Sequence, residues 1–487
     1  MGVATVASSL LFKGGTSMLR ILGRGTRPCD GITRREAMCV GGLSLFGGVS
    51  LPTFLAGQES RGSVRPGTAK SVVLLNLFGG PPHLDMFDMK PAAPVEVRGE
   101  FKPIESSVPG TSVCELLPLT AQVMDRTTLI RTYSHKYNSH NPYNVYTGFD
   151  GGDDRENYFA KRSDHPGMGA ICQYLNLGSS DVPRYVIMPA YPGYSQALRR
   201  AGPYGGYLGS QYDPLFTIWD KKFAGKGGFY EPATALGVPL LPALGNLADV
   251  TADRLDRRRS LLDQIDQSVA TVEASRAAQG MSHFQQQVFS LLTSAKTRGA
   301  FDISRESDRV LDRYGRHLWG SSMVIARRLV EAGSTFVSVN WEEADSGNHW
   351  DMHNNNFGMC RALLPTLDQI VSALILDLEE RGLLDSTLVV VMGEMGRTPR
   401  VNRSAGRDHW PQCGFALLAG GGVKRGFVLG KTDDQAAYPV DRPVSAGDMV
   451  ATIYQLLGID PHMTVADRTG RPIAICHGGE PVFEAIM

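Results

Sequence analysis

Short, nearly continuous apolar runs alternate with stretches of helical periodicity from about residue 70 to the end of the chain. Each apolar run is bounded by turn-forming or polar residues, which is typical of buried strands. The expected strands cover residues 71–78, 128–132, 185–188, 335–340, 387–392 and 415–419. Amphipathic spacing predicts helices over residues 308–332, 361–381 and 448–457. Apolar strands separated by helices predict an α/β fold in which a mostly parallel sheet is covered on both faces.

Residues 251–298 interrupt this alternation. Thr251 opens the segment as a helix cap would, and charged and apolar residues then follow at helical spacing. We expect a helical insertion packed on or over the sheet. Its dense charge is more typical of a solvated face than of a binding patch.

The N-terminal segment has the pattern of an export signal. Arg34 and Arg35 precede a weakly hydrophobic, glycine-rich run over residues 39–57. Twin arginines before such a run resemble a twin-arginine (Tat) signal, whose machinery exports folded proteins. The alternative is a chance arginine pair before a short core helix. We expect residues 1–60 to be signal and linker, beginning at Met1 or Met18, and residues 61–487 to be the α/β domain of a periplasmic or extracellular protein.

Composition narrows the classes of partner. Lys and Arg together number 49, as do Asp and Glu, so no bulk charge attracts nucleic acid or an anionic membrane. The run over residues 39–57 contains too much glycine and too many polar residues for a stable membrane span. The seven cysteines form no C-x-x-C pair, so we expect free buried thiols rather than a disulfide framework or thiolate zinc site.

Histidines and carboxylates gather where the expected strands end. In open α/β sheets, ligands bind outside the carboxyl ends of the strands, so these side chains are expected at one edge. Mixed imidazole and carboxylate donors suit zinc or manganese best, with iron or calcium as further options. The candidate metal ligands are Asp351, His353, His409, Glu394, His83 and Asp85.

Each of these candidate ligands could also have a structural role that involves no metal. Asp351 and His353 could be a hydrogen-bonded pair within a loop, and Glu394 could cap a helix or hold Arg397. The segment after the strand at 128–132 adds His135, Ser139 and His140. Ser139 is a candidate nucleophile and His140 a candidate ligand or acid/base. A polar loop that binds its own backbone is an equally good interpretation of that segment.

Several motifs, in order, resemble the bacterial family called domain of unknown function 1501 (DUF1501). They are FGGPPHLDMFD at 78–88, FDIS at 301–304, ARRLVEAG at 326–333, WDMH at 350–353, GEMGRTP at 393–399 and GRDHW at 406–410. The resemblance covers nearly everything from residue 33 onward. It implies a three-layer α/β/α sandwich similar to the alkaline phosphatase and sulfatase superfamily.

The same resemblance implies ligand positions. Asp351 and His353 fall where an Asp…His pair of the superfamily grips one metal, and His409 falls where a later His completes that site. Glu394 and Met395 stand in place of an Asp-His pair. Gly79 and Gly80 stand in place of a first-strand Asp, so that His83 or Asp85 would have to substitute. A one-metal and a two-metal site both remain open. The absence of a Cys-x-Pro-x-Arg motif argues against a formylglycine sulfatase.

These observations predict an exported, metal-dependent hydrolase of phosphate or sulfate esters, acting on a small-molecule or polysaccharide ester. In this hypothesis Arg397 neutralises the oxyanion of the ester, because its planar fork matches a phosphate or sulfate face. The rival hypothesis is a non-catalytic exported protein that uses the scaffold as a binding or assembly module. A carbohydrate-active enzyme with paired carboxylates is a third class, but no such pair stands out.

Overall fold

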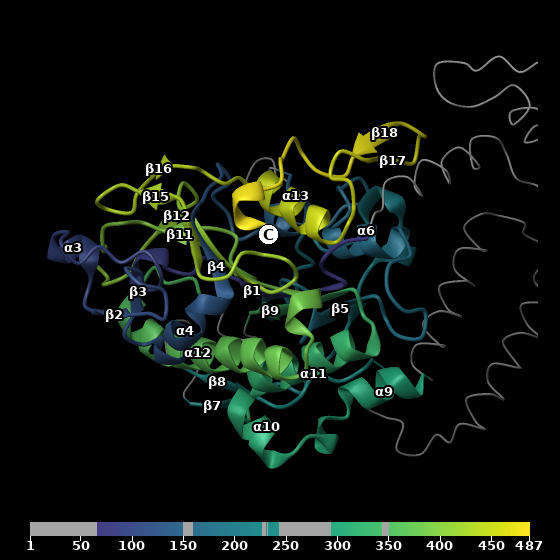
Figure 1. The fold of residues 1–487 in the computed structure, drawn as a ribbon, viewed down its shortest axis with the longest axis horizontal. Coiled ribbons are helices and arrows are strands. Elements are labelled where there is room, and N and C mark those ends of the chain that lie inside the picture. The colour runs from purple at the N-terminus through teal and green to yellow at the C-terminus, as the bar shows by residue number, and fades with distance from the viewer. Residues whose placement is uncertain (1–65, 150–158, 226–229, 231, 243–293, 343–349) are drawn as a thin grey trace, which may run out of the picture. The chain divides into compact units, whose positions relative to one another are not determined.

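An eight-stranded sheet forms the centre of the computed structural model (Figure 1). The structure describes residues 66–149, 159–225, 230, 232–242, 294–342 and 350–487. Across the sheet the strands are β14 (Phe427–Leu429), β4 (Thr127–Tyr133), β13 (Gly414–Ala419), β10 (Thr387–Met392), β1 (Ser71–Leu77), β9 (Phe336–Trp341), β5 (Tyr185–Met188) and β6 (Leu215–Phe216). β13 is antiparallel to both of its neighbours, whereas the other paired strands are parallel.

The central strands are apolar on both sides because both faces of the sheet are covered. Every residue of β1, β9 and β10 is buried. Successive side chains of a strand point to opposite faces, so Val73 and Leu75 join one hydrophobic core and Val72 and Leu74 the other. The nearly continuous apolar runs in the sequence follow from this double burial.

Two groups of helices form the outer layers. On one face lie α11 (Leu318–Ala332) and α12 (Asn356–Glu380), whose apolar residues pack in the first core. On the other face lie α6 (Met168–Tyr174) and α13 (Ala446–Leu456), which pack in the second core. Figure 1 shows α12 and α13 on opposite sides of the strands. The predicted three-layer α/β/α sandwich with a mostly parallel sheet is therefore confirmed.

Two helix predictions need correction. The expected helix over 308–332 is two helices, α10 (Asp308–Tyr314) and α11, because Gly315 has a φ of +87° and ends the first. His317 then caps α11 by accepting a hydrogen bond from the Gly320 N–H. Helix α12 begins at Asn356, before the expected start at residue 361. By length and composition α12 could cross a membrane, but it is a largely buried core helix of the sandwich.

Sequence periodicity missed the short edge strands β6 and β14, since two or three residues carry no period. The other described α-helices are α3 (Val95–Arg98), α4 (Pro118–Val123), α5 (Tyr143–Thr147) and α9 (Ala295–Phe301). The remaining strands form two-stranded ribbons: β2 (Pro103–Glu105) with β3 (Ser112–Cys114), β7 (Lys222–Ala224) with β8 (Thr234–Leu236), β11 (Gly396–Arg397) with β12 (His409–Trp410), β15 (Lys431–Thr432) with β16 (Pro439–Asp441), and β17 (Thr464–Ala466) with β18 (Pro472–Ala474).

Two predicted segments fall mainly or wholly outside the described residues. The signal and linker, residues 1–60, lie entirely outside them. Most of the predicted helical insertion, residues 251–298, also lies outside, and its last residues form the start of α9. The cysteines of the described residues are buried and free, as the sequence predicted: Cys114, Cys172, Cys360, Cys413 and Cys476.

Candidate metal centre

Four candidate ligands meet at the edge of the sheet where the parallel strands end. His140 follows β4, and Asp351 and His353 follow β9. His409 belongs to β12, shortly before the antiparallel strand β13 begins at the same edge. The register of β4, β10, β1 and β9 places their carboxyl ends together, which is where open α/β sheets bind ligands.

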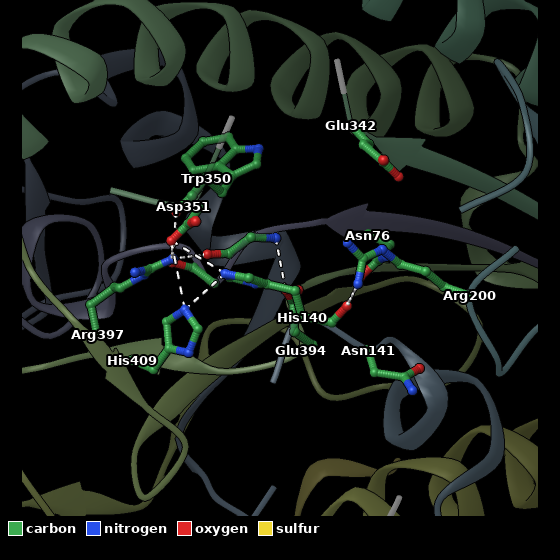
Figure 2. A network of polar contacts seen from close by, with 12 residues as sticks. Asn76, His140, Asn141, Arg200, Glu342, Trp350, Asp351, Glu394, Arg397 and His409 are labelled. Atoms are coloured by element: carbon green, nitrogen blue, oxygen red, sulfur yellow. Dashed lines mark hydrogen bonds and ion pairs between the residues drawn. The ribbon is translucent and has the colours of Figure 1, made fainter. Parts of the chain in front are cut away.

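The ligand atoms converge around one oxygen of Asp351. Its Oδ1 lies 3.1 Å from His353 Nε2, 3.2 Å from His140 Nε2 and 3.6 Å from His409 Nε2. His140 Nε2 and His409 Nε2 are 2.8 Å apart. One ligand atom from each residue lies within 4.8 Å of the others. Figure 2 shows Asp351, His140 and His409 turned toward one another.

This group fits a transition-metal ion. Bonds of about 2.0–2.1 Å in a tetrahedral arrangement hold ligand atoms roughly 3.3 Å apart. The three separations from Asp351 Oδ1 and the one between His140 and His409 lie between 2.8 and 3.6 Å. Three imidazoles with one carboxylate suit zinc, manganese or iron, whereas calcium prefers a shell of oxygens. His140, Asp351, His353 and His409 could therefore hold a divalent metal.

Burial of the group is uneven. Asp351 and His140 are buried, with 8% and 7% of their surface exposed. The His353 side chain keeps 33% of its surface exposed, and that of His409 keeps 19%. Solvent therefore reaches the group from the side of His353.

Burial and contacts within the group shift the pKa values of its members. Burial alone would raise the pKa of Asp351, but hydrogen bonds from His140 and His409 and the charge of Arg397 hold it well below its usual range. Burial lowers the pKa of His409 to about 4, which keeps that imidazole neutral and able to donate a lone pair. For His140, burial is outweighed by its contacts with Asp351 and Glu394, so its pKa is raised.

Two carboxylates contact the histidines from outside the group. Glu394 Oε1 lies 2.8 Å from His140 Nδ1, and Asp408 Oδ1 lies 2.7 Å from His353 Nδ1. The sequence predicts Glu394 as a ligand, yet its carboxylate contacts His140 at Nδ1, the ring nitrogen that faces away from Asp351. It is not a member of the four-residue group.

Arg397 does not present its guanidinium to an open site. The residue is fully buried in β11, and it donates hydrogen bonds to the carbonyls of Gly79, Gly80, Trp350 and Arg407. Its Nη2 also donates to Asp351 Oδ1 over 2.7 Å. The predicted contact with a substrate oxyanion therefore needs correction, because these bonds make Arg397 an anchor for Asp351.

His83 and Asp85 lie outside the group as well. Both oxygens of Asp85 accept hydrogen bonds from the buried guanidinium of Arg407, at 2.8 and 3.0 Å, and one also accepts from Asn356. His83 Nε2 lies 2.9 Å from the Ala436 carbonyl oxygen, and burial lowers the pKa of this histidine. The structure therefore gives these two predicted ligands internal partners instead of a place in the group.

Of the two candidates in the segment after β4, Ser139 and His140, only His140 lies in the group. His140 belongs to the four-residue group, whereas the sequence left its role open between a ligand and an acid/base. Ser139 is buried, but among the described residues its hydroxyl forms no hydrogen bond with any member of that group. His135 contacts the Glu394 carbonyl oxygen with Nε2.

A second buried polar network lies beside the group and was not predicted. Asn76 Nδ2 donates to Asn340 Oδ1 over 2.7 Å, and Asn340 Nδ2 donates to Glu342 Oε2 over 3.1 Å. The charge of Arg200, which Figure 2 draws beside Asn76, acts on the Glu342 carboxylate. Asn76 and Asn340 occur near the ends of largely apolar strands, a polar signal that the sequence did contain. The sequence around Arg200 gives no such signal, because Arg200 lies in a loop and only the tertiary fold places it near these residues.

Comparisons with known proteins identify the family of the chain but do not identify an activity. A family model described as "Protein of unknown function (DUF1501)" matches residues 69–486. No curated protein matches the chain. Similar solved structures include the lipoteichoic acid synthase LtaP from Listeria monocytogenes, with 11% identity over 87% of this chain and 80% of that chain and a TM-score of 0.34.

Two further solved structures are similar at the same low level. The PsFucS1 sulfatase from Pseudoalteromonas sp. has 11% identity over 83% of this chain and 71% of that chain, with a TM-score of 0.35. The phosphonate monoester hydrolase SpPMH from Silicibacter pomeroyi has 12% identity over 85% of this chain and 75% of that chain, with a TM-score of 0.34.

Proposed function

The chain belongs to the DUF1501 family, and we propose that it is an exported, metal-dependent hydrolase of phosphate or sulfate esters within the alkaline phosphatase and sulfatase superfamily. One observation carries this proposal. Three imidazole nitrogens and one carboxylate oxygen, from three separate segments of the chain, converge at the carboxyl edge of the sheet. Ion pairs that only stabilise a fold do not need three imidazole Nε2 atoms facing one carboxylate oxygen.

The metal would be held by His140, Asp351, His353 and His409. When bound, zinc or manganese would supply a Lewis acid that polarises the ester and lowers the pKa of a nearby water. The protein's own residues prepare the site. Arg397 holds the carboxylate of Asp351 in place, and burial keeps His409 neutral. The exposed side of His353 is the side from which an ester would approach.

Water is the simpler nucleophile for this geometry. Ser139 is adjacent to His140 in the chain, but its hydroxyl makes no hydrogen bond with the group among the described residues. Replacing Ser139 by Ala tests the alternative. If Ser139 is the nucleophile, Ser139→Ala abolishes turnover and keeps the metal; if water attacks, turnover persists.

The rival function is a non-catalytic binding module with a structural metal. Four protein ligands are typical of closed structural zinc sites, whereas catalytic zinc usually keeps one position for water. Arg397 was the cation expected to bind an anionic ester, but its guanidinium is bonded to the Gly80 carbonyl and to Asp351. Turnover decides between the hydrolase and a module that holds a structural metal, and a metal-free protein would also favour the module.

The test begins with metal content, measured by mass spectrometry on protein purified without chelators. We expect about one equivalent of zinc, manganese or iron, lost in the His353→Ala/His409→Ala double variant. His462→Ala is the matched control, because that histidine is exposed and lies outside the group. Phosphate and sulfate esters are then assayed with the loaded protein. Wild-type protein without metal would overturn the proposal, and loaded protein without turnover would favour the binding module.

Export through the twin-arginine pathway is part of the same proposal. It is supported by Arg34 and Arg35 before the weakly hydrophobic run in the sequence. Replacing both by Lys should leave the full-length protein in the cytoplasm, as followed by cell fractionation. Unchanged export of that variant would contradict the proposal.

A further inference from the structure

Glu394 is fixed in a position from which it contacts a histidine of the group but not its centre. The residue is fully buried, two residues beyond the end of β10. Its Oε1 accepts hydrogen bonds from the Gly79 N–H, over 2.8 Å, and meets His140 Nδ1, also at 2.8 Å. Its backbone carbonyl contacts the side chains of His135 and Asn144. These bonds hold both the backbone and the side chain of the residue, so the carboxylate cannot turn toward Asp351 without losing its bonds to Gly79 and His140.

A bond at Nδ1 determines what the other ring nitrogen can do. A carboxylate at Nδ1 keeps a proton there, because the carboxylate can only accept. The lone pair of a neutral ring is then left on Nε2, and a nearby negative charge makes that lone pair more basic. His140 Nε2 is the atom that faces Asp351 and His409.

We propose that Glu394 is a positioning residue of the metal centre, which fixes the orientation and protonation pattern of His140 and does not bind the metal itself. This inference deepens the proposed function and rests on it. It also gives a reason for the buried carboxylate of Glu394. An isolated buried charge destabilises the fold, and here the bonds to Gly79 and His140 offset part of that cost. The neighbouring Oε2 of Glu394 has no hydrogen-bond partner among the described residues, so Oε1 alone forms the side-chain contacts.

Asp408 holds His353 in the same way but from an exposed position. Its side chain is 53% exposed, whereas that of Glu394 is fully buried. Water can replace an exposed carboxylate as a partner for Nδ1 but cannot easily reach a buried ring. Loss of Asp408 is therefore expected to weaken metal binding less than loss of Glu394.

The experiment compares Glu394→Ala and Glu394→Gln with wild type, and uses Glu342→Gln as the matched control. Glu342 is an equally buried glutamate after β9, but it bonds to Gly193, Ser195 and Asn340 and touches no histidine of the group. Zinc affinity is measured by competition with a chelating dye. Loss of such a partner costs about 10- to 100-fold in metal affinity, which is the fall we expect for Glu394→Ala.

Glu394→Gln keeps an oxygen in the place of Oε1 and so tests the charge separately from the shape. It should retain part of the affinity lost in Glu394→Ala, and Glu342→Gln should bind zinc as wild type does. The cobalt-loaded proteins provide a second readout. The absorption spectrum of Glu394→Gln should keep the wild-type band pattern, because the ligands are the same. A changed ligand set in that variant would overturn the inference by making Glu394 a ligand.

A measurement without metal separates this inference from the proposed function. In metal-free protein with ¹⁵N-labelled histidine, the His140 Nδ1 proton should be protected from solvent exchange and give a resolved NMR signal. Glu394→Ala should remove that signal, and Glu342→Gln should keep it. If wild type binds no metal, the proposed function fails while this signal still tests the Glu394–His140 contact. If Glu394→Ala and Glu394→Gln fold with unchanged affinity and an unchanged signal, Glu394 does not position His140. Glu394→Gln carries the test alone if Glu394→Ala does not fold.

Discussion

The guanidinium of Arg397 donates a hydrogen bond over 2.7 Å to Oδ1 of Asp351, the same oxygen that faces His140, His353 and His409. Arg397 is fully buried and bonds four backbone carbonyls from three segments of the chain. Because the Arg397 guanidinium is fixed in this way, it holds the Asp351 carboxylate in one position and favours its ionised form. The position of the candidate metal centre thus depends on a residue that does not belong to the four-residue group.

Arg397→Ala is expected to lower both stability and metal affinity. Removal of one partner of a buried ion pair costs about 3–5 kcal/mol, because the other charge is left uncompensated. Arg397→Lys should restore little, since an ammonium group cannot reproduce the planar fork that reaches these carbonyls. Urea unfolding and zinc competition measure the two effects.

Arg425→Ala is the control for Arg397. Its side chain is 43% exposed and pairs with Glu379 and Asp385, so its loss should cost no more than about 1 kcal/mol. Wild-type zinc affinity in a folded Arg397→Ala variant would contradict the anchoring role.

Asp85→Ala is expected to lower stability and leave the number of bound metal ions unchanged. Asp85 and Arg407 form a buried pair in which both oxygens of Asp85 are used, so the variant leaves the guanidinium unpaired at a cost of about 3–5 kcal/mol. Metal content at saturating zinc and urea unfolding are measured on the same sample. Loss of a whole metal equivalent with little loss of stability would make Asp85 a ligand after all.

Acidification should destabilise the fold partly through His317. Burial lowers the pKa of this histidine to about 4, below its ordinary value of 6.5. The unfolded chain therefore binds the proton more readily, so stability is complete above about pH 6.5 and is lost as the pH falls toward 4. Between pH 7 and pH 5 the loss is about 2 kcal/mol, since each pKa unit corresponds to about 1.4 kcal/mol.

His317→Asn isolates this contribution, because Asn can also cap α11 but does not titrate. The variant should lose less stability than wild type between pH 7 and pH 5 in urea unfolding. Equal losses in the two proteins would show that His317 does not titrate differently on folding. His165 and His409, whose pKa values burial also lowers to about 4, contribute equally to both proteins.

The described cysteines should not react with a thiol reagent in the native protein. Burial raises the pKa of Cys114 and Cys172 to about 12 and that of Cys476 to about 11, and all three side chains are buried. Thiolate is the reactive form, so both effects slow the reaction. A disulfide-exchange reagent should label these cysteines, as located by peptide mass spectrometry, only after unfolding. Rapid labelling of any of the three in the native state would contradict this burial.

The sequence by itself determined the class of fold and most central strands. Burial on both faces makes a strand continuously apolar, and this signal is local, so β5 and β10 occur at the predicted bounds. The same local reasoning failed for the helix break at Gly315, where one positive φ outweighs an uninterrupted helical pattern. The motifs also predicted the family and named three of the four residues that meet at the candidate centre, Asp351, His353 and His409, with His140 among the site candidates.

Only the tertiary structure decided which polar residues face one another. Asp85 and Arg407 are 322 residues apart in sequence, and His140 and Glu394 are 254 apart, so no local pattern could pair them. A carboxylate at a strand end has the same sequence signal whether it binds a metal, an arginine or a histidine. Its role depends on which donor the fold brings within about 3 Å, because hydrogen bonds and metal bonds act only at that range. That geometry gave Arg397 and Glu394 their supporting positions and left Asp351 with the three histidines.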